Sequence, residues 1–481
     1  MLTILLLGIP FIAAGAVLLM QKSAKQIALC AGLLELAATV VAFVFYKQDA
    51  SHPYLSFGQE WIGPLGMSFS FSLDGISLVM MLLCSILLPL IVYSQYHKVY
   101  KNAHVFYSML LLMVGSMVGA FTTTDALLFY VFYEFALIPI YFMCLIWGSG
   151  ENKARVTLKF FLYTLFGSLF MLVALLYVHN ISGSFALTAM YEAANGMSTE
   201  EQGWLLAAFF IAFAVKIPVF PFHTWQPSTY DAAPLAGTML LAGIMLKMAT
   251  YGLIRLVLPM LPEGVAEYGD WCLALCAISV VYASCMAIVQ KRYKLLIAYS
   301  SIAHVGLLAA GILSGNAQGI QGGVVEMLSH GIIGVGLFFV YDIIASRMGH
   351  DEMQRMGGIR EVNSTFAFLF FAIVMGSVAL PATSGFVGEF LLLIGLYQYS
   401  PVLTGVAGLT VVLGAVYMLR AFQQMMLGGS NHNTASFAPL TTHEKTVLGI
   451  IVALIVLLGV YPSIVLELSN ASVENLLIGI N

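Results

Sequence analysis

The stretch Phe209–Trp225 reads FFIAFAVKIPVFPFHTW, and it decides how the rest of the chain is read. It is apolar enough to lie in a membrane, yet it contains Lys216, Pro218 and Pro221. A proline removes a backbone donor and clashes with the preceding turn, so the helix is predicted to kink or unwind just after Lys216. Unwound backbone inside a membrane is tolerated only where protein or water satisfies its polar groups. The stretch therefore predicts a broken helix at an interior, hydrated position.

The composition of the whole chain indicates an integral membrane protein. Of 481 residues, 60% are hydrophobic and 9% are charged, with a mean hydropathy of +0.95. Ordinary soluble domains carry about 25% charged residues, which cover a surface exposed to water. The net charge of -4 is scattered, with no basic patch that would indicate a nucleic-acid partner. We expect one polytopic domain in contact with the lipid bilayer.

Long apolar segments recur along the chain with short gaps between them. A helix needs about 20 apolar residues to cross a bilayer. On this rule the sequence predicts about fourteen spans, of which the twelfth is long and broken near Pro381. The predicted spans are 2–19, 27–45, 74–94, 105–121, 126–147, 157–178, 203–222, 236–258, 271–289, 296–314, 322–345, 365–398, 402–427 and 445–461.

Lysine and arginine are distributed unevenly between the predicted loops. Loops after odd-numbered spans carry most of them, including Lys22, Lys98 and Lys291. Loops after even-numbered spans hold only Lys47, with Arg255 near the end of the eighth span. Because cytoplasmic loops carry an excess of Lys and Arg, we expect the odd-numbered loops in the cytoplasm. The chain is then a multi-pass protein of the cell's inner (plasma) membrane, with both termini on the outer, periplasmic side.

Four ionisable side chains lie near the middle of predicted spans: Glu134, Lys216, Lys247 and Glu389. A charge at the bilayer centre costs at least about 2.5–3.5 kcal/mol, so such residues form pairs or line a hydrated path. One interpretation is that each is a satisfied buried charge that holds helices together. Two acids and two lysines at a similar depth favour a path for an ion. Their signs predict that Glu134 pairs with Lys216 or with Lys247.

Two histidines, His304 and His330, also lie within predicted spans. A lone histidine inside a membrane can be a hydrogen-bonded core residue. A neutral imidazole can also accept a proton on one nitrogen while the other nitrogen releases one. Both histidines lie between the lysines and Glu389 in chain order, which suits a proton relay. His223 is either a third member of this relay or a boundary group.

Three other acids are weaker candidates. Glu35 lies in the middle of the second predicted span, where a structural and a functional role are equally open. Glu326 and Asp342 lie near the two ends of the eleventh predicted span. We therefore expect these two side chains to be solvated or interfacial.

A second break is predicted in LPATSGFVGEF, residues 380–390, where Pro381 and Gly385 precede Glu389. The two broken spans are the fourth in two successive blocks of five spans, and because five is odd the second block is inverted. Matching interruptions in two inverted halves indicate a transport site. We predict an all-α integral membrane fold with two inverted five-helix repeats. The predicted segments are 1–103 with three helices, 104–258 and 259–427 with the repeats, broken near 216–221 and 381–389, and 428–481 with a C-terminal helix.

The sequence offers no ligand set for a redox centre. Iron–sulfur clusters and structural zinc need several cysteine or histidine ligands together. All six cysteines lie in predicted apolar segments, and none forms a C-x-x-C pair. A dinucleotide-binding G-x-G-x-x-G loop after a strand is also missing from the sequence. We expect no metal and no cofactor in this chain, so electrons must be carried elsewhere.

Five motifs together carry a family resemblance: YEFALIPIYF (133–142), AVKIPVFPFHTW (214–225), APLAGTMLLAGIMLKMATYGLIR (233–255), AYSSIAHVGLL (298–308) and LPATSGFVGEF (380–390). In this order they resemble the proton-translocating, antiporter-like subunits of respiratory complex I, the NADH:quinone oxidoreductase. Among these the M type is most similar, the counterpart of mitochondrial subunit four. The resemblance implies that proton translocation depends on Glu134, Lys216, Lys247, His304, His330 and Glu389.

Two positions distinguish this chain within that group. Glu389 stands where the related L and N types, and the D-type subunit of sodium/proton antiporters, typically have lysine, whereas the M type has glutamate. Tyr133 stands where a tryptophan is common before the acid. The first position supports the M type, and the second affects only local geometry.

The resemblance implies that other subunits drive this chain. NADH, flavin, iron–sulfur clusters and quinone are expected in those subunits, and the neighbours are expected to be other antiporter-like membrane subunits of complex I. The main alternative is a subunit of a multi-subunit sodium/proton antiporter. A stand-alone solute transporter and a structural membrane anchor are further alternatives.

Overall fold

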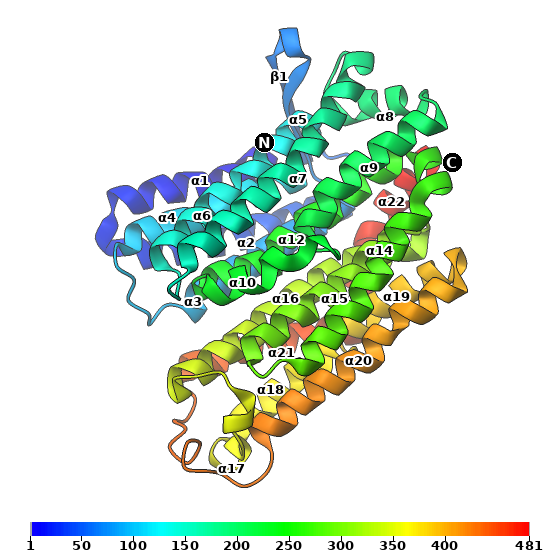
Figure 1. Cartoon of the computed structure of the whole chain (residues 1–481). Coiled ribbons are helices and arrows are strands. Elements are labelled where there is room, and N and C mark those ends of the chain that lie inside the picture. The colour runs from blue at the N-terminus through cyan, green and yellow to red at the C-terminus, as the bar shows by residue number, and fades with distance from the viewer. Residues whose placement is uncertain (1, 481) are drawn as a thin grey trace.

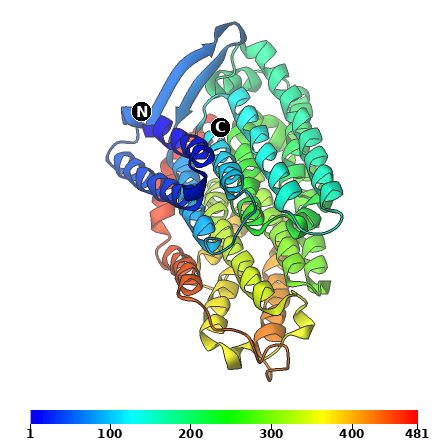
Figure 2. The same cartoon turned by 90° about the vertical axis from the view of Figure 1, so that its left-hand side faces the viewer.

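The computed structural model describes residues 2–480, and it consists almost entirely of helices that run side by side (Figure 1). Within these residues, twelve helices are long and apolar enough to cross a membrane. Figure 2 shows the same bundle from its N-terminal side, where the first two helices lie on the outside. The chain is a multi-pass helical membrane protein.

The N-terminal part contains an element that the sequence analysis missed, a two-stranded antiparallel hairpin between the second and third spans. The expectation of an all-α fold is wrong here. The strand MSFSFS alternates polar and apolar residues, the pattern typical of a strand, whereas SFGQEWI does not, and both are too short to stand out among apolar spans. The elements are α1 (Leu2–Leu19), α2 (Ala24–Gln48), β1 (Ser56–Ile62), β2 (Met67–Ser72) and α3 (Gly75–Ser94).

The middle of the chain forms a second group of helices that packs against α1, α3 and the central helices. Its elements are α4 (Ala103–Thr122), α5 (Ala126–Phe135), α6 (Leu137–Trp147), α7 (Lys153–Ser182), α8 (Leu187–Asn195), α9 (Thr199–Lys216), α10 (Gln226–Ala232), α11 (Leu235–Leu240), α12 (Leu246–Gly252) and α13 (Leu258–Met260). Two π-helical segments, Leu241–Met245 and Leu253–Val257, flank α12. Such segments widen a helix locally and often occur at functional sites.

The last part of the chain surrounds one very buried helix, α16. Every residue in the apolar window of α16 is buried, whereas most of the apolar windows of α20 and α21 faces outward. Outward-facing apolar side chains suit contact with lipid. The elements are α14 (Pro262–Val289), α15 (Tyr293–Leu313), α16 (Ala317–Met348), α17 (Ile359–Val362), α18 (Ser364–Ser377), α19 (Ser384–Tyr399), α20 (Pro401–Met426), α21 (Thr442–Val460) and α22 (Ser463–Ile480).

The stretch quoted at the start contains a helix end inside the bundle. Helix α9 ends at Lys216, six residues short of the predicted span 203–222, and a 3-10 turn begins only at Phe222. The last carbonyls of a helix have no intrahelical partner. One of them, the Val215 oxygen, accepts a hydrogen bond of 2.7 Å from the Trp225 indole. The Phe220 N–H donates to the Ser279 hydroxyl on α14 over 3.2 Å.

A second interruption separates α18 from α19. Helix α18 ends at Ser377 and α19 begins at Ser384, with Pro381 between them. The Thr383 hydroxyl donates to the Leu380 carbonyl over 2.6 Å, which satisfies part of the unwound backbone. These two interrupted regions are the predicted spans missing from the twelve. Helix α9 carries Glu200, Glu201 and Lys216, and α18 and α19 are each shorter than a full span.

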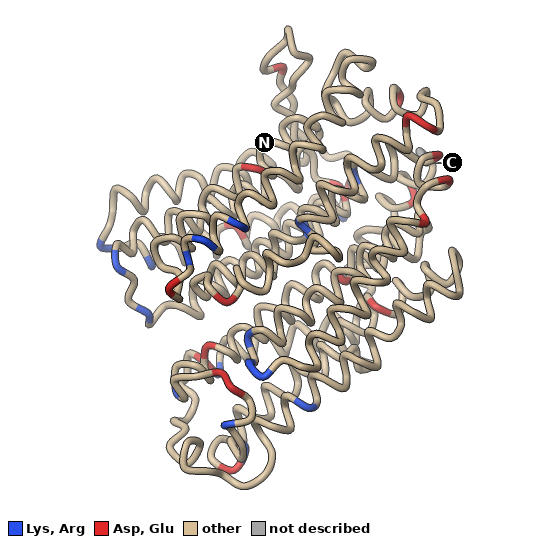
Figure 3. Tube along the Cα trace, in the orientation of Figure 1, with Lys and Arg blue, Asp and Glu red and all other residues tan. Residues whose placement is uncertain are grey.

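Basic side chains gather at one end of the helices. Figure 3 shows most Lys and Arg residues toward the lower left, while the hairpin and both termini lie toward the other end. Ion pairs join helices and loops from separate parts of the chain at the basic end. The pairs are Lys98 with Asp342, Arg292 with Asp231 and Asp351, and Arg347 with Glu444.

Candidate functional site

Lys216 lies at the C-terminal end of α9 and is 1% exposed. Its amine donates a hydrogen bond of 2.9 Å to the Tyr133 carbonyl on α5, and it lies 3.2 Å from the centroid of the Tyr133 ring. A cation over an aromatic face is attracted by the ring quadrupole. The lysine is therefore held by a carbonyl dipole and a ring on a neighbouring helix.

Glu134 is the residue directly after that carbonyl. Its Oε1 atom is buried without a hydrogen-bond partner, and its carboxyl interacts electrostatically with Lys216. Of the two pairings predicted from sequence, the structure brings Glu134 near Lys216. Within residues 2–480, no ion pair joins these two side chains directly. Glu134 thus interacts with Lys216 electrostatically, without a direct ion pair.

Lys247 lies on α12, between the two π-helical segments, and is fully buried. Its amine contacts the Nδ1 atom of His330 on α16 over 2.9 Å. It also donates to the Ala242 carbonyl in the preceding π-helical segment over 2.5 Å. The partner of Lys247 is therefore a histidine, not Glu134.

His304 on α15 and Glu389 on α19 form a second buried pair. The Nδ1 atom of His304 lies 2.8 Å from Oε1 of Glu389, and the two residues are 7% and 3% exposed. The ring centroids of His304 and His330 lie 6.1 Å apart. Two hydrogen-bonded pairs, Lys247 with His330 and His304 with Glu389, thus lie next to each other in the bundle.

The predicted site residues therefore form two groups. The first contains Glu134 and Lys216, and the second contains Lys247, His304, His330 and Glu389. Among the described residues, no recorded hydrogen bond joins the two groups. Helix α12, which carries Lys247, packs against α9 on one side and against α15 and α16 on the other. This helix is the element through which the groups meet.

Sequence reasoning misplaced Glu326. The expected position near a membrane interface is wrong, because α16 begins at Ala317, five residues before the predicted span. Glu326 is 3% exposed, and its Oε2 atom has no hydrogen-bond partner. Glu326 lies close to His304 and Glu389. One carboxylate oxygen or ring nitrogen from each of the three residues lies within 4.8 Å of the other two. No sequence motif marked this position.

The other candidates occupy less informative places. Asp342 pairs with Lys98 at the basic end, as an interfacial acid would. His223 is 4% exposed and packs against the rings of Phe220 and Tyr282. Glu35 is fully buried on α2, and neither of its carboxyl oxygens has a hydrogen-bond partner.

The geometry around Glu389 is that of a hydrogen bond. Two ligands of one tetrahedral zinc ion lie about 3.3 Å apart, given metal–ligand bonds of about 2.0–2.1 Å. The separation of 2.8 Å between His304 and Glu389 is shorter and matches a charge-assisted hydrogen bond. The arrangement thus suits the binding and transfer of a proton.

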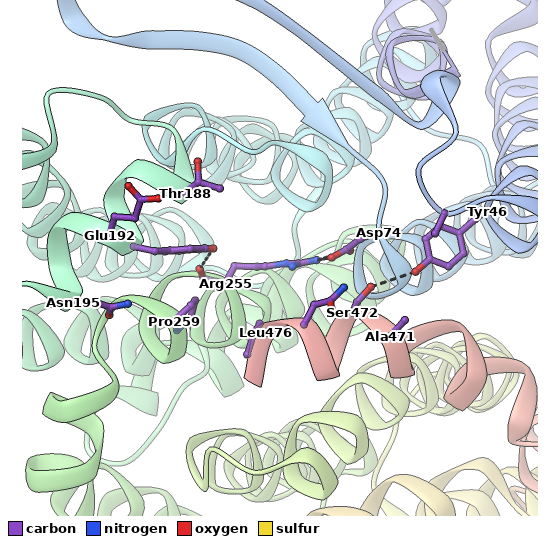
Figure 4. A pocket seen from close by; sticks show the side chains of 13 residues that line it. Tyr46, Asp74, Thr188, Glu192, Asn195, Arg255, Pro259, Ala471, Ser472 and Leu476 are labelled. Atoms are coloured by element: carbon purple, nitrogen blue, oxygen red, sulfur yellow. Dashed lines mark hydrogen bonds and ion pairs between the residues drawn. The ribbon is translucent and has the colours of Figure 1, made fainter. Parts of the chain in front are cut away.

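A separate cavity of about 540 Å³ opens near the hairpin end of the bundle (Figure 4). An ion pair between Arg255 and Asp74 crosses it, and the Tyr191 hydroxyl donates to the Arg255 carbonyl over 2.7 Å. Burial would raise the pKa of the Asp74 carboxyl, but the Arg255 guanidinium and the hydrogen bonds from Ser77 together hold that pKa below its ordinary value. None of the six predicted site residues lines this cavity.

Fold and site together define a class: a helical membrane protein with interrupted helices and buried ionisable side chains at its centre. Residues 123–414 match the model of a family described as NADH:quinone oxidoreductase/Mrp antiporter, TM. The chain is 38% identical over 455 residues to NADH-quinone oxidoreductase subunit M of Rickettsia conorii, covering 94% of this chain and 92% of that protein. This chain belongs to the NADH:quinone oxidoreductase/Mrp antiporter membrane family.

Solved structures agree with this assignment. A chain of respiratory complex I from Thermus thermophilus matches with a TM-score of 0.90 and 29% identity over 100% of both chains. A chain of the Mrp complex from a Dietzia species matches with a TM-score of 0.84 at 19% identity, covering 100% of this chain and 98% of that one. The second likeness shows a shared fold alone.

Proposed function

We propose that this chain is the proton-translocating, M-type membrane subunit of an NADH:quinone oxidoreductase. The observation that carries the proposal is the pair of buried groups of ionisable side chains, each next to an interrupted helix. Its relatives are named as subunit M of that enzyme. Electron transfer from NADH to quinone takes place in other subunits, and this chain couples it to proton movement as part of the translocating oxidoreductase.

The proposed architecture has fourteen transmembrane helices with two inverted five-helix repeats. It adds α9 and the interrupted pair α18 and α19 to the twelve long apolar helices. Residues 1–103 precede the repeats at 104–258 and 259–427, and residues 428–481 follow them. The interruptions after Lys216 and before Glu389 occupy matching places in the two repeats, which supports the assignment of both as transport elements.

In the first repeat, Glu134 and Lys216 act as a switch. A nearby carboxylate favours the charged lysine, and separation of the two side chains favours proton release. Because they interact without a direct contact, a small movement of α5 or α9 changes the interaction strongly in a protein interior of low dielectric constant. The movement is driven by neighbouring subunits.

From the first repeat into the second, the proton passes from Lys247 on α12 to His330, His304 and Glu389. The contacts of 2.9 Å and 2.8 Å within the two pairs are hydrogen-bond distances. The step between the histidines requires a water molecule or a ring movement, since the ring centroids are 6.1 Å apart. The proton enters from the cytoplasmic side and leaves on the outer side.

The partners of this chain are other antiporter-like membrane subunits of complex I and the lipid bilayer. NADH, flavin, iron–sulfur clusters and quinone belong to other subunits of the enzyme. The location is the cell's inner (plasma) membrane with both termini outside. The gathering of basic residues at the end away from the termini supports this orientation.

Substitution of Lys216 or Glu134 tests the proposal. We expect Lys216→Ala and Glu134→Ala, in the assembled enzyme, to lower proton pumping and coupled quinone reduction by about tenfold or more. NADH oxidation by a soluble artificial acceptor should remain, because that reaction takes place in other subunits. Pumping is measured in vesicles with a pH-sensitive dye. Wild-type pumping and coupled activity in both variants would contradict the proposal.

The second candidate is a subunit of a sodium/proton antiporter, which the fold shared with the Mrp complex keeps open. Glu389 in place of a lysine argues against it. Purification of the tagged chain from its membrane decides between the two. Co-purified NADH-binding and iron–sulfur subunits support the oxidoreductase, whereas a small set of membrane subunits alone supports the antiporter.

A further inference from the structure

Glu326 is a buried ionisable group that the proposed proton path leaves unused. It lies in the third turn of α16, the most buried helix of the bundle. It is 3% exposed and its Oε2 atom has no hydrogen-bond partner. A buried carboxylate without a partner is costly, so its surroundings must compensate for it.

Lys247 on α12 supplies an opposite charge, and polar groups on α15 and α19 lie close to Glu326. A carboxylate oxygen of Glu326, a carboxylate oxygen of Glu389 and a ring nitrogen of His304 all lie within 4.8 Å of one another. The second oxygen of Glu389 and the Nε2 atom of His304 are also buried without a partner among the described residues. Each of these three residues, two of which form the hydrogen bond between His304 and Glu389, therefore has one buried polar atom without a partner.

Glycine residues bring the two carboxyl groups together. A Cβ atom added at Gly388, the residue before Glu389, would lie 2.8 Å from the Glu326 Cβ atom and would also contact its carboxylate. A Cβ atom at Gly322 would lie 2.6 Å from the Leu392 backbone nitrogen. Small residues allow this close approach of helices in membranes. The short distance between Glu326 and Glu389 is thus built into the backbone packing.

Two carboxylates at this distance in a dry interior do not both stay ionised. Like charges disfavour one another, and one proton shared by two carboxyl groups relieves the repulsion. His304 on α15 and Lys247 on α12 face the pair from other helices, and the Tyr417 hydroxyl on α20 lies near Glu389. His330 follows Glu326 by four residues on α16 and contacts Lys247. The pair therefore lies at the end of the basic groups in the proposed path.

We propose that Glu326 and Glu389 form a carboxyl pair that holds one translocated proton, with His304 as the group that delivers it. This inference rests on the proposed function. Delivery breaks the N–H bond at Nδ1 of His304 and forms an O–H bond at Oε1 of Glu389. The proton is then shared with Glu326. On release, the carboxyl O–H bond breaks and the proton passes to a water molecule. Glu326 is thus a proton-binding residue of the same reaction.

Substitutions at Glu326 in the assembled enzyme test the pair. We expect Glu326→Gln, which keeps the shape and removes the charge, to lower coupled pumping by about tenfold, because positioned proton-transfer groups contribute at least that much. Glu326→Asp should restore part of the activity. The double variant with Glu389→Gln should cost no more than Glu389→Gln alone, because the two groups act as a unit. Strictly additive losses would contradict the proposal.

A matched control separates charge from packing. The Ser329 hydroxyl, one turn further along α16, donates to Ser384 on α19 over 2.8 Å. Ser329→Ala loosens the same interface without removing a charge, and it should pump as the wild type does. A loss in Ser329→Ala equal to that in Glu326→Gln would assign Glu326 a packing role and overturn the proposal.

Infrared difference spectroscopy gives a readout that a packing role would not change. A shared proton predicts a protonated-carboxyl band that disappears in Glu326→Gln and in Glu389→Gln alike. A band that persists unchanged in Glu326→Gln would overturn the pair. The measurement of one zinc ion per chain in the wild type, with loss of that zinc in Glu326→Gln, is a further outcome. That result would show that the two carboxyl groups hold a metal ion in place of a proton, and it would overturn the proposal too.

The proposed function fails separately. If Lys216→Ala and Glu389→Gln pump normally, the proposed function is wrong. If those variants fail to pump while Glu326→Gln matches the wild type in rate and pH profile, only the carboxyl pair is wrong.

Discussion

At the residue scale, Lys216 is held by a carbonyl and an aromatic ring. The Lys216 amine nitrogen lies 3.2 Å from the centroid of the Tyr133 ring. Glu134 interacts with the same amine electrostatically, without a direct contact. The Tyr133 hydroxyl itself is buried without a partner. The ring therefore matters for the lysine more than the hydroxyl does. The family resemblance implies a tryptophan at the position of Tyr133, and both residues supply an aromatic face.

Substitution of Tyr133 tests this arrangement. A desolvated cation–π contact is worth about 2 kcal/mol. We expect Tyr133→Leu to lower coupled proton pumping by about tenfold or more, because the ammonium form of Lys216 loses that stabilisation. Tyr133→Phe keeps the ring and should pump within about twofold of the wild type. Equal losses in both variants would assign the effect to the hydroxyl. Pumping in vesicles is the measurement.

Residue positions were predictable where a charge interrupts an apolar span. Lys216, Lys247 and Glu389 stand out because a buried charge is rare in a membrane. Glu326 carries the same signal, but its span was predicted to start at residue 322 and α16 starts at Ala317. Five residues of helix are about 7.5 Å, enough to move a side chain from an interface into the interior. Helix ends are set by caps and packing that periodicity does not reveal.

At the element scale, prolines predicted where helices are interrupted, but packing decided how. The prediction for 203–222 ran past the observed end of α9, because the apolar pattern continues through Ile217–Phe222. The π-helical segments around Lys247 left no sequence signal. The first, Leu241–Met245, packs against α3 and α16, and the second, Leu253–Val257, packs against α9 and α15. A Cβ atom at Gly331 on α16 would lie 2.8 Å from the Gly243 carbonyl.

The ion pair of Asp74 with Arg255 joins the end of the hairpin to the helix that carries Lys247. We expect Asp74→Asn to lower the midpoint of thermal unfolding at about pH 7, where the carboxyl is ionised. The pKa of Asp74 is lowered in the folded chain, so its stabilisation is full above the ordinary carboxyl pKa of about 4 and is lost as pH falls through the lowered value.

The difference between wild type and Asp74→Asn should therefore shrink as the pH falls below about 4. The measurement is the unfolding midpoint of the detergent-solubilised enzyme across this range. Glu192→Gln is the control, since Glu192 lines the same cavity and is exposed. A stability difference that does not depend on pH would show that the charge of Asp74 is not what stabilises this end.

At the scale of the whole molecule, the gathering of basic residues at one end of the bundle predicts one orientation, with that end in the cytoplasm. Ion pairs at the basic end tie the helices together, and Arg292 joins α10 to the segment after α16 through Asp231 and Asp351. The hairpin and the Asp74–Arg255 cavity mark the opposite end. Each end of the bundle thus has ion pairs that join segments far apart in the chain.

Cysteine labelling tests the orientation. Two exposed residues lie on opposite predicted sides of the membrane. They are Gly196, between α8 and α9, and His432, between α20 and α21. We expect Gly196→Cys to react with a membrane-impermeant thiol reagent in intact cells, and His432→Cys to react only after permeabilisation. Cys30 and Cys285 are exposed and should first be replaced by alanine. The opposite labelling pattern would reverse the proposed topology.

The sequence by itself determined that this is a multi-pass helical membrane protein, because apolar segments of span length leave few other folds. It also determined the family and where charges interrupt the spans, because buried charges and prolines are local signals. Only the tertiary structure decided that Lys247 contacts His330, that His304 contacts Glu389, and that Glu326 lies beside them. Those contacts join residues 83 and 85 positions apart. Partners so distant in the chain are chosen by helix packing, to which glycines such as Gly388 contribute without a visible pattern.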